Sequence, residues 1–220
     1  MARNVKAPLA ACFACAVALG LLTLLALGLA AGRHLDVRLF FRLAEHHPSG
    51  GTAADAVAGL ADPLPMLGLL AVACAVAFLR GRSRDALAAL AVVAGANLTT
   101  QLLKILLAHP RVKTAIGGDP FEPNTFPSGH TTAAASIAIA YVYVVPARLR
   151  ALTLTLGAAF ALAVGCSVIV IGWHYPSDVL AGFLIAAGWG FAVLAAMRVL
   201  APQPQGRRRQ PPSPAAISVK

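Results

Sequence analysis

Residues 8–31 read PLAACFACAVALGLLTLLALGLAA, a run of 24 residues without a single charge. A helix needs about 20 consecutive apolar residues to cross a bilayer, so this run is long enough for one crossing. Arg3 and Lys6 precede it, as basic residues precede the core of a signal peptide, but that core is only about 7–15 residues long. We therefore predict a retained membrane helix at this position.

Five more apolar stretches follow along the chain. They cover residues 64–79, 86–107, 129–146, 150–171 and 178–200. Inside lipid the backbone has to satisfy its own hydrogen bonds, which favours helices. The expected fold is all-α, a bundle of six transmembrane helices within residues 1–200. Residues 201–220 are rich in Pro, Gln, Arg and Ser, so we predict a disordered, basic, Pro-rich cytoplasmic tail there.

The composition also favours a membrane protein. Hydrophobic residues make up 59% of the 220 residues and charged residues 12%, whereas a soluble domain carries about 25% charged residues. The formal charge of +10 is high enough to suggest nucleic-acid binding, but that function needs a basic face on a soluble fold. Cytoplasmic loops of membrane proteins collect Lys and Arg, which accounts for the charge without a nucleic-acid partner.

The loop charges predict the orientation of the chain. With the N-terminus inside, the cytoplasmic segments hold 12 of the 18 basic residues and one acidic residue, Asp85. The segments on the other side hold six basic and seven acidic residues. Because cytoplasmic loops are enriched in Lys and Arg, we predict a multi-pass protein of the inner (plasma) membrane with both termini in the cytoplasm.

Two further features have modest interpretations. The four cysteines, Cys12, Cys15, Cys74 and Cys166, all lie within apolar runs and are expected to be packing residues rather than a redox or metal site. A weakly amphipathic stretch from Leu35 to Leu43 is expected to lie on the outer membrane interface.

Residues 126–130 read FPSGH and stand directly before the fourth apolar run. Ser128 is a favoured N-cap residue, and the first N–H groups of a helix have no partner within the helix and attract anions. Gly129 leaves the approach to these groups open. Ser128, Gly129 and His130 can therefore offer several donors to one phosphate, although an ordinary helix cap explains the same residues.

His174 lies between the fifth and sixth runs, and Asp178 follows four residues later. In one interpretation Asp178 accepts the Nδ1 proton of His174 and leaves Nε2 free to act as a nucleophile, as the orienting group does in a catalytic triad. Simpler interpretations are a carboxylate favoured by a helix N-terminus and an interfacial histidine between Trp173 and Tyr175.

Lys104 lies near the end of the third run, and Arg111 follows seven residues later. Asn97, Gln101 and Lys104 recur at helical spacing and are expected to share one face of a helix. Polar residues in a membrane helix usually face the interior of the bundle, so Lys104 is predicted to point at a protected site. A snorkelling Lys104 and a solvated Arg111 are the alternatives.

In the predicted topology these three clusters reach the same, outer side of the membrane. Together they offer two cations, a helix N-terminus, two histidines and a carboxylate. Phosphoryl transfer needs charge stabilisation on the phosphoryl oxygens, an in-line nucleophile and an acid for the leaving group. The combination therefore favours a phosphoryl-transfer site on the periplasmic or extracellular side.

The three clusters resemble the signature of the type 2 phosphatidic acid phosphatase superfamily, which shares its catalytic core with vanadium haloperoxidases. The family pattern is Lys-x6-Arg-Pro, then Pro-Ser-Gly-His, then Ser-Arg-x5-His-x3-Asp, and it corresponds here to residues 104–112, 127–130 and 167–178. The resemblance implies a six-helix phosphatase/haloperoxidase-like core, no metal and no cofactor. It implies His174 as the nucleophile that forms a phosphohistidine, Asp178 as its orienter, His130 as the acid and base, and Lys104, Arg111, Ser128 and Gly129 as phosphate-binding residues.

The chain departs from this pattern at two positions. Val112 replaces the proline after Arg111, which affects only the loop. Val168 replaces an arginine that would hold phosphate in a bidentate geometry, and its loss is expected to remove about 2–4 kcal/mol of transition-state stabilisation.

The resemblance implies a lipid phosphate or pyrophosphate phosphatase that acts on a substrate such as polyprenyl pyrophosphate, phosphatidic acid or phosphatidylglycerophosphate. A phosphotransferase that uses the same phosphohistidine is an alternative that no feature of the sequence separates from it. A catalytically impaired lipid-binding or transport protein is a third, supported by Val168 alone.

Overall fold

The computed structural model describes residues 4–44, 53–107 and 126–200, and these contain helices and no strands. The prediction of an all-α fold is therefore confirmed for the described residues, whereas the predicted tail at 201–220 lies outside them. The α-helices are α1 (Lys6–Thr23), α2 (Ala30–Ala44), α3 (Ala53–Gly59), α4 (Pro63–Leu79), α5 (Ser83–Leu106), α6 (Gly129–Val144), α7 (Arg150–Val170) and α8 (Pro176–Leu200). A π-helical turn, Leu24–Gly28, continues α1, and a 3-10 turn, Ala147–Leu149, precedes α7.

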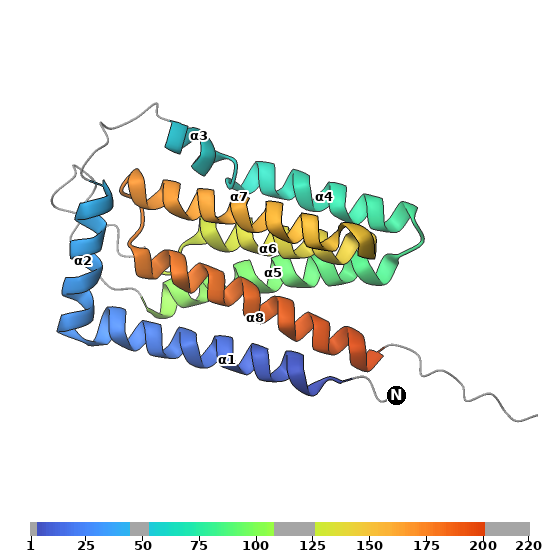
Figure 1. Ribbon diagram of the computed structural model, residues 1–220, viewed down its shortest axis with the longest axis horizontal. Helices are drawn as coiled ribbons and strands as arrows, with labels where there is room; N and C mark the ends of the chain where they lie inside the picture. Colours follow the sequence, from blue (N-terminus) through green and yellow to red (C-terminus); the bar gives the residue numbers. More distant parts are fainter. Residues whose placement is uncertain (1–3, 45–52, 108–125, 201–220) are drawn as a thin grey trace, which may run out of the picture.

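The long helices lie alongside one another, and α6 occupies the middle of the bundle, in contact with α4, α5, α7 and α8 (Figure 1). Small side chains make this position possible, because they let neighbouring backbones approach closely. The buried residues of α6 are mostly Ala, Ser and Thr. A Cβ atom added at Gly157 of α7 would lie 2.7 Å from Ala138 of α6, so the close contact between these helices requires glycine there.

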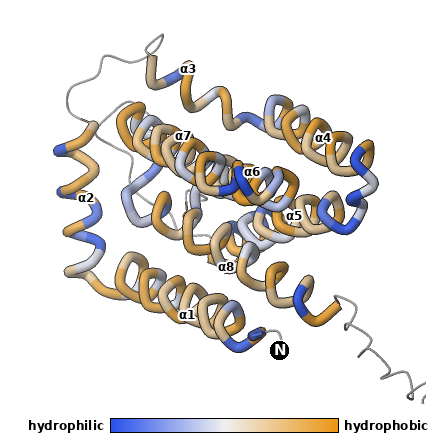
Figure 2. Tube along the Cα trace, turned by 45° about the vertical axis from the view of Figure 1, so that its right-hand side comes forward, coloured by the Kyte–Doolittle hydropathy of each residue, from blue (hydrophilic) through white to orange (hydrophobic). Residues whose placement is uncertain are grey.

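Large apolar side chains cover the outside of the bundle, as expected for a surface that faces lipid. Four helical segments are long and apolar enough to cross a membrane, namely Lys6–Gly28, Ser83–Leu106, Ala147–Val170 and Pro176–Leu200. Helices α3 and α4 form a bent pair, at 50°, that brings the number to five if it counts as one span. Figure 2 shows the apolar residues along the helices and polar residues gathered near their ends. The chain is thus a multi-pass membrane protein.

The remaining predicted span, residues 129–146, corresponds to α6, which has 16 residues. At 1.5 Å per residue such a helix is about 24 Å long, shorter than the hydrocarbon core of about 30 Å. Six helices do form close to the six predicted positions, but by length and composition only four or five are candidate spans. The number of crossings therefore stays a prediction.

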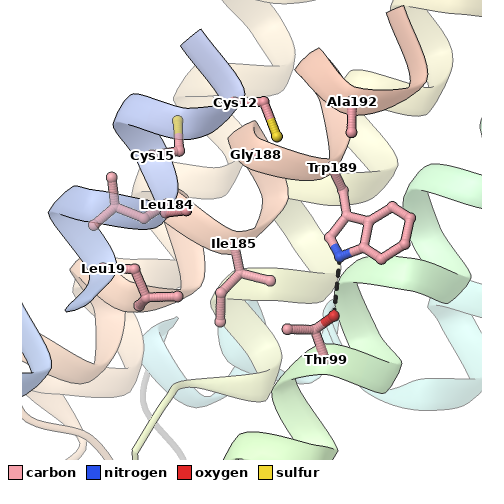
Figure 3. Close-up of a pocket in the computed structure, with 10 residues that line it drawn as sticks. Cys12, Cys15, Leu19, Thr99, Leu184, Ile185, Gly188, Trp189 and Ala192 are labelled. Atoms are coloured by element: carbon pink, nitrogen blue, oxygen red, sulfur yellow. Dashed lines mark hydrogen bonds between the residues drawn. The ribbon is translucent and has the colours of Figure 1, made fainter. Parts of the chain in front are cut away.

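Helix α1 packs along α8 and encloses a shallow apolar groove that Figure 3 shows in close-up. Cys12 and Cys15 of α1 line this groove, and both thiols are free. On its other side the Trp189 indole N–H donates a hydrogen bond of 2.9 Å to Thr99 Oγ1 of α5 (Figure 3). The groove is apolar packing space between three helices.

Helix α2 crosses one end of the bundle at a steep angle to the other helices (Figure 1). The amphipathic stretch from Leu35 to Leu43 lies within it. The Asp36 carboxylate accepts hydrogen bonds from the Ser177 backbone N–H (3.0 Å) and the Ser177 hydroxyl (2.6 Å) at the start of α8. Phe40 packs on Tyr175 with a ring-centroid distance of 4.7 Å. These contacts fix α2 over the end of the bundle where α6 and α8 begin.

Candidate active site

The start of α6 has the geometry that its sequence predicts. Ser128 is the N-cap, and its hydroxyl oxygen accepts hydrogen bonds from the Thr131 N–H (3.3 Å) and the Thr131 hydroxyl (3.0 Å). Its own N–H donates to the backbone carbonyl of Asp178 at 3.0 Å, which joins the first turns of α6 and α8. Among the described residues, nothing lies within 4 Å of a Cβ atom built on Gly129. The first turn of α6 is therefore uncrowded at Gly129, beside the fully buried Ser128.

The turn between α7 and α8 holds His174. Gly172 has φ +81°, a left-handed conformation that favours glycine, and it lets the chain reverse at the end of α7. The backbone N–H groups of Trp173 and His174 both donate to the Val168 carbonyl at 3.0 Å. These two hydrogen bonds fix the backbone of His174 just before the first turn of α8.

His174 and Asp178 form the pair that their spacing predicts. Nδ1 of His174 lies 3.3 Å from Oδ2 of Asp178, and both side chains are buried. The same carboxylate oxygen accepts the Tyr175 backbone N–H at 3.0 Å. The backbone N–H just before α8 therefore helps to hold the Asp178 carboxylate in place. Because this carboxylate contacts Nδ1 of His174, Nε2 is left available.

The environment of His174 favours the neutral imidazole. Burial lowers the pKa of His174 below its ordinary value, and the charge of nearby Lys104 acts in the same direction. The hydrogen bond and the negative charge of Asp178 oppose this shift without reversing it. A neutral imidazole carries the lone pair that a nucleophile requires.

The second histidine lies across from the first. The ring centroids of His130 and His174 are 6.5 Å apart, and the His130 ring lies 5.3 Å from that of Trp173. Nε2 of His130 is 3.1 Å from Oδ1 of Asp62, which precedes α4. The two imidazoles thus lie near one another at the helix ends, each in contact with a carboxylate.

The cationic part of the predicted site is described only in part. Lys104 occupies the last turn of α5, partly buried and close enough for its charge to act on His174. Arg111 and Val112 lie outside the described residues. The expected polar face of α5 needs one correction, because Gln101 is exposed. Thr100 is buried instead, and its hydroxyl bonds that of Thr132 on α6 at 3.0 Å.

Val168, at the position where the family pattern has arginine, is fully buried. Its apolar neighbours are Ala58 of α3, Ile169 of α7 and Val179 of α8. The residue has become part of the core that holds α3 against α7.

Two carboxylates near the site were missed by the sequence analysis. Asp62 contacts His130, and Asp36 contacts the start of α8. Asp62 directly precedes Pro63, and an acidic residue followed by proline is an ordinary way for a helix to begin. The sequence around Asp62 therefore does not indicate a catalytic role. Asp36 is a buried acid within a helix whose other charged residues are exposed, a contrast that the sequence alone does not reveal.

The fold and these residues define a class of protein, an all-helical membrane bundle with a histidine–carboxylate pair beside the serine-capped N-terminus of a helix. The PAP2 superfamily profile matches residues 85–201, which is more than half of the chain, and the chain belongs to this family. The resemblance predicted from the three motifs is therefore confirmed, and the family supports phosphatase activity in general.

One solved structure has the same fold. It is the crystal structure of the first transmembrane PAP2-type phosphatidylglycerolphosphate phosphatase from Bacillus subtilis. The match has a TM-score of 0.74 and 20% sequence identity, and it covers 86% of this chain and 97% of the other. Among curated protein sequences, none matches this chain.

Proposed function

We propose that this protein is a metal-independent lipid phosphate or pyrophosphate phosphatase that acts through a phosphohistidine. The observation that carries the proposal is the buried His174, which is bonded to Asp178 through Nδ1 and faces His130. A structural histidine does not need a second imidazole across an open helix N-terminus, whereas two-step phosphoryl transfer does.

In the first step the lone pair on Nε2 of His174 attacks phosphorus, and the bond from phosphorus to the leaving oxygen breaks. His130 gives a proton to that oxygen, so the leaving group departs as an alcohol or a phosphate. Asp178 accepts the Nδ1 hydrogen bond and stabilises the positive charge that develops on the His174 ring. In the second step His130 takes a proton from water, the water oxygen attacks phosphorus, and Nε2 of His174 is released.

Charge on the transferred group needs donors around it. We infer that the backbone N–H groups at the start of α6, beside Gly129, and the ammonium of Lys104 supply them. We assign the same role to Arg111 from the family pattern. Ser128 caps α6 with its hydroxyl oxygen, which fixes the helix start. Because a hydroxyl that accepts can also donate, we keep Ser128 among the phosphate-binding residues that the family pattern implies.

A lipid substrate suits the position of this site at one end of a membrane-spanning bundle. There a headgroup phosphate can reach the helix ends while the acyl or prenyl chains stay in the bilayer. The Bacillus subtilis neighbour acts on phosphatidylglycerolphosphate, which makes this lipid one candidate beside phosphatidic acid and polyprenyl pyrophosphate.

The test is phosphate release from these three lipids by the detergent-purified protein in the presence of EDTA. We expect turnover without added metal, inhibition by vanadate, and loss of at least about 1000-fold in kcat for His174→Ala. His34→Ala is the matched control, because His34 is an exposed histidine on α2. Full activity of His174→Ala would remove the proposed mechanism. Saturable lipid binding by the wild type without turnover would instead indicate the impaired, lipid-binding alternative.

A further inference from the structure

A large groove opens in the bundle at the end opposite the candidate active site. Helix α7 ends and α8 begins at the turn that holds His174, and away from this turn the two helices diverge, with α6 between them (Figure 1). The resulting cavity has a volume of about 1000 Å³ and is lined mainly by residues from the second half of α8, the second half of α6 and the start of α7. Its size is at the upper end of ligand-binding pockets, which measure about 300–1000 Å³.

The inner walls of this groove are apolar over most of their length. They are formed mainly by Ile139, Val142, Leu154, Phe191, Leu194 and Met197. Tyr143 contributes a hydroxyl to the described lining, and this hydroxyl donates a hydrogen bond of 2.6 Å to the Gly190 carbonyl. These walls suit a hydrocarbon chain rather than a polar solute.

The rim of the groove is basic. Arg150, the first residue of α7, and Arg198, near the end of α8, both line it. Asp85 is also at the rim, but Arg82 forms an ion pair with it. Within the described part of the chain neither Arg150 nor Arg198 has a carboxylate partner, since Arg198 donates to the neutral backbone carbonyl of Asn4 at 2.6 Å. Two positive charges therefore remain at the mouth of an apolar groove.

We propose that this groove binds an anionic phospholipid of the adjacent leaflet, with its headgroup phosphate between Arg150 and Arg198 and its acyl chains along the apolar walls. The charges select for an anionic headgroup, and the N-terminus of α7 adds a favourable partial charge at the same position. Residues 201–220 carry three consecutive arginines, so their charge repels this rim. The site is separate from the phosphatase site, because the two lie at opposite ends of α8.

The test is native mass spectrometry of delipidated full-length protein with added dioleoyl phosphatidylglycerol or dioleoyl phosphatidylethanolamine. We expect one tightly bound phosphatidylglycerol, held at least about fivefold more strongly than phosphatidylethanolamine. Arg150→Gln removes one charge and should weaken phosphatidylglycerol binding about fivefold. Ala187→Trp, which fills the apolar part of the groove, should abolish it. Arg148→Gln, at an exposed residue of the same end that does not line the groove, should bind as the wild type does.

Equal binding of the two lipids would overturn the proposal, as would wild-type binding by both Arg150→Gln and Ala187→Trp. The proposal would also be overturned if Arg148→Gln lost as much phosphatidylglycerol binding as Arg150→Gln. General attraction to the basic end of the bundle would then explain the preference for phosphatidylglycerol. Binding that appears only after residues 201–220 are deleted would identify the tail as the occupant instead. Melting temperatures of all variants in the same detergent keep loss of binding distinct from loss of folding.

Discussion

In the proposed mechanism His174 has to be neutral to attack phosphorus, and its surroundings favour the neutral form. Burial lowers its pKa from the ordinary value of about 6.5, so the proton that blocks the nucleophile binds only at lower pH. We expect kcat/KM to show no decline as the pH falls toward 6.5 and to decline only below that value. A pH–rate profile of the wild type measures this acidic limb.

The Asp178→Asn variant tests whether protonation of His174 causes the decline of kcat/KM at low pH. The negative charge and the hydrogen bond of Asp178 raise the pKa of His174, so their removal should move the limb to lower pH. The maximal rate should fall at least about 100-fold, because the orientation and charge stabilisation of the imidazole are lost. Asp85→Asn, at the other end of the bundle, is the control and should leave the profile unchanged. A limb that moves to higher pH in Asp178→Asn would contradict the assigned roles.

Val168→Arg restores the arginine of the family pattern. The variant tests whether position 168 only packs in the core or also reaches the phosphate. Because Val168 is fully buried among apolar side chains, an arginine there would be an unpaired charge in the core of the α3–α7 contact. We expect the melting temperature to fall by at least about 5 °C, without a gain in rate.

Val168→Met introduces a long apolar side chain and distinguishes the effect of charge from that of size. It should lower the melting temperature less than arginine does. A Val168→Arg protein as stable as the wild type and faster would show that position 168 reaches the phosphate after all.

At the level of residues, the sequence predicts contacts that are local. His174 and Asp178 are four residues apart and Ser128 and Thr131 are three apart, so helix geometry alone brings them together. The contact between Asp62 and His130 joins residues 68 positions apart in the sequence. No periodicity encodes such a contact, because it depends on how α4 packs beside α6.

Among the elements, α2 is joined to the start of α8 by a buried polar interaction. The Asp36 carboxylate accepts two hydrogen bonds from Ser177, and hydrogen bonds to a charged group contribute about 1.5–3 kcal/mol. We expect a double-mutant cycle of Asp36→Ala and Ser177→Ala, measured by thermal or denaturant unfolding, to give a coupling free energy of at least about 1 kcal/mol.

Arg38→Ala is the matched control, since Arg38 is exposed on the same helix. It should change the free energy of unfolding by less than about 0.5 kcal/mol. Additive effects of Asp36→Ala and Ser177→Ala would show that the carboxylate is not what joins α2 to α8.

Helix positions were predicted closely, and the exceptions have physical reasons. The predicted stretches 150–171 and 178–200 correspond to Arg150–Val170 and Pro176–Leu200, because a long apolar run is a strong signal. Helix α3, with seven residues, was missed because a short helix held by packing leaves no periodic pattern. The predicted run 8–31 continues past the end of α1, since hydropathy does not mark the point where the chain turns into α2.

For the whole molecule, the charge distribution predicts one orientation in the membrane. Six arginines lie at the end of the bundle opposite the candidate site, next to the ends of α4, α5, α7 and α8. They are Arg80, Arg82, Arg84, Arg148, Arg150 and Arg198. We expect this arginine-rich end of the bundle to lie in the cytoplasm. A membrane-impermeant maleimide should label His34→Cys in intact cells, whereas Arg148→Cys should react only after permeabilisation. The wild-type chain corrects for its native thiols, and the reverse labelling pattern would invert the topology.

The most direct measurement of the proposed chemistry is capture of the covalent intermediate. Protein mixed with a lipid labelled with ³²P on its terminal phosphate is quenched in alkali, in which phosphohistidine is stable, and the labelled peptide is identified. We expect label on Nε2 of His174 during turnover and no label in His174→Ala. Turnover without a labelled histidine, or label on His130 in place of His174, would contradict the mechanism.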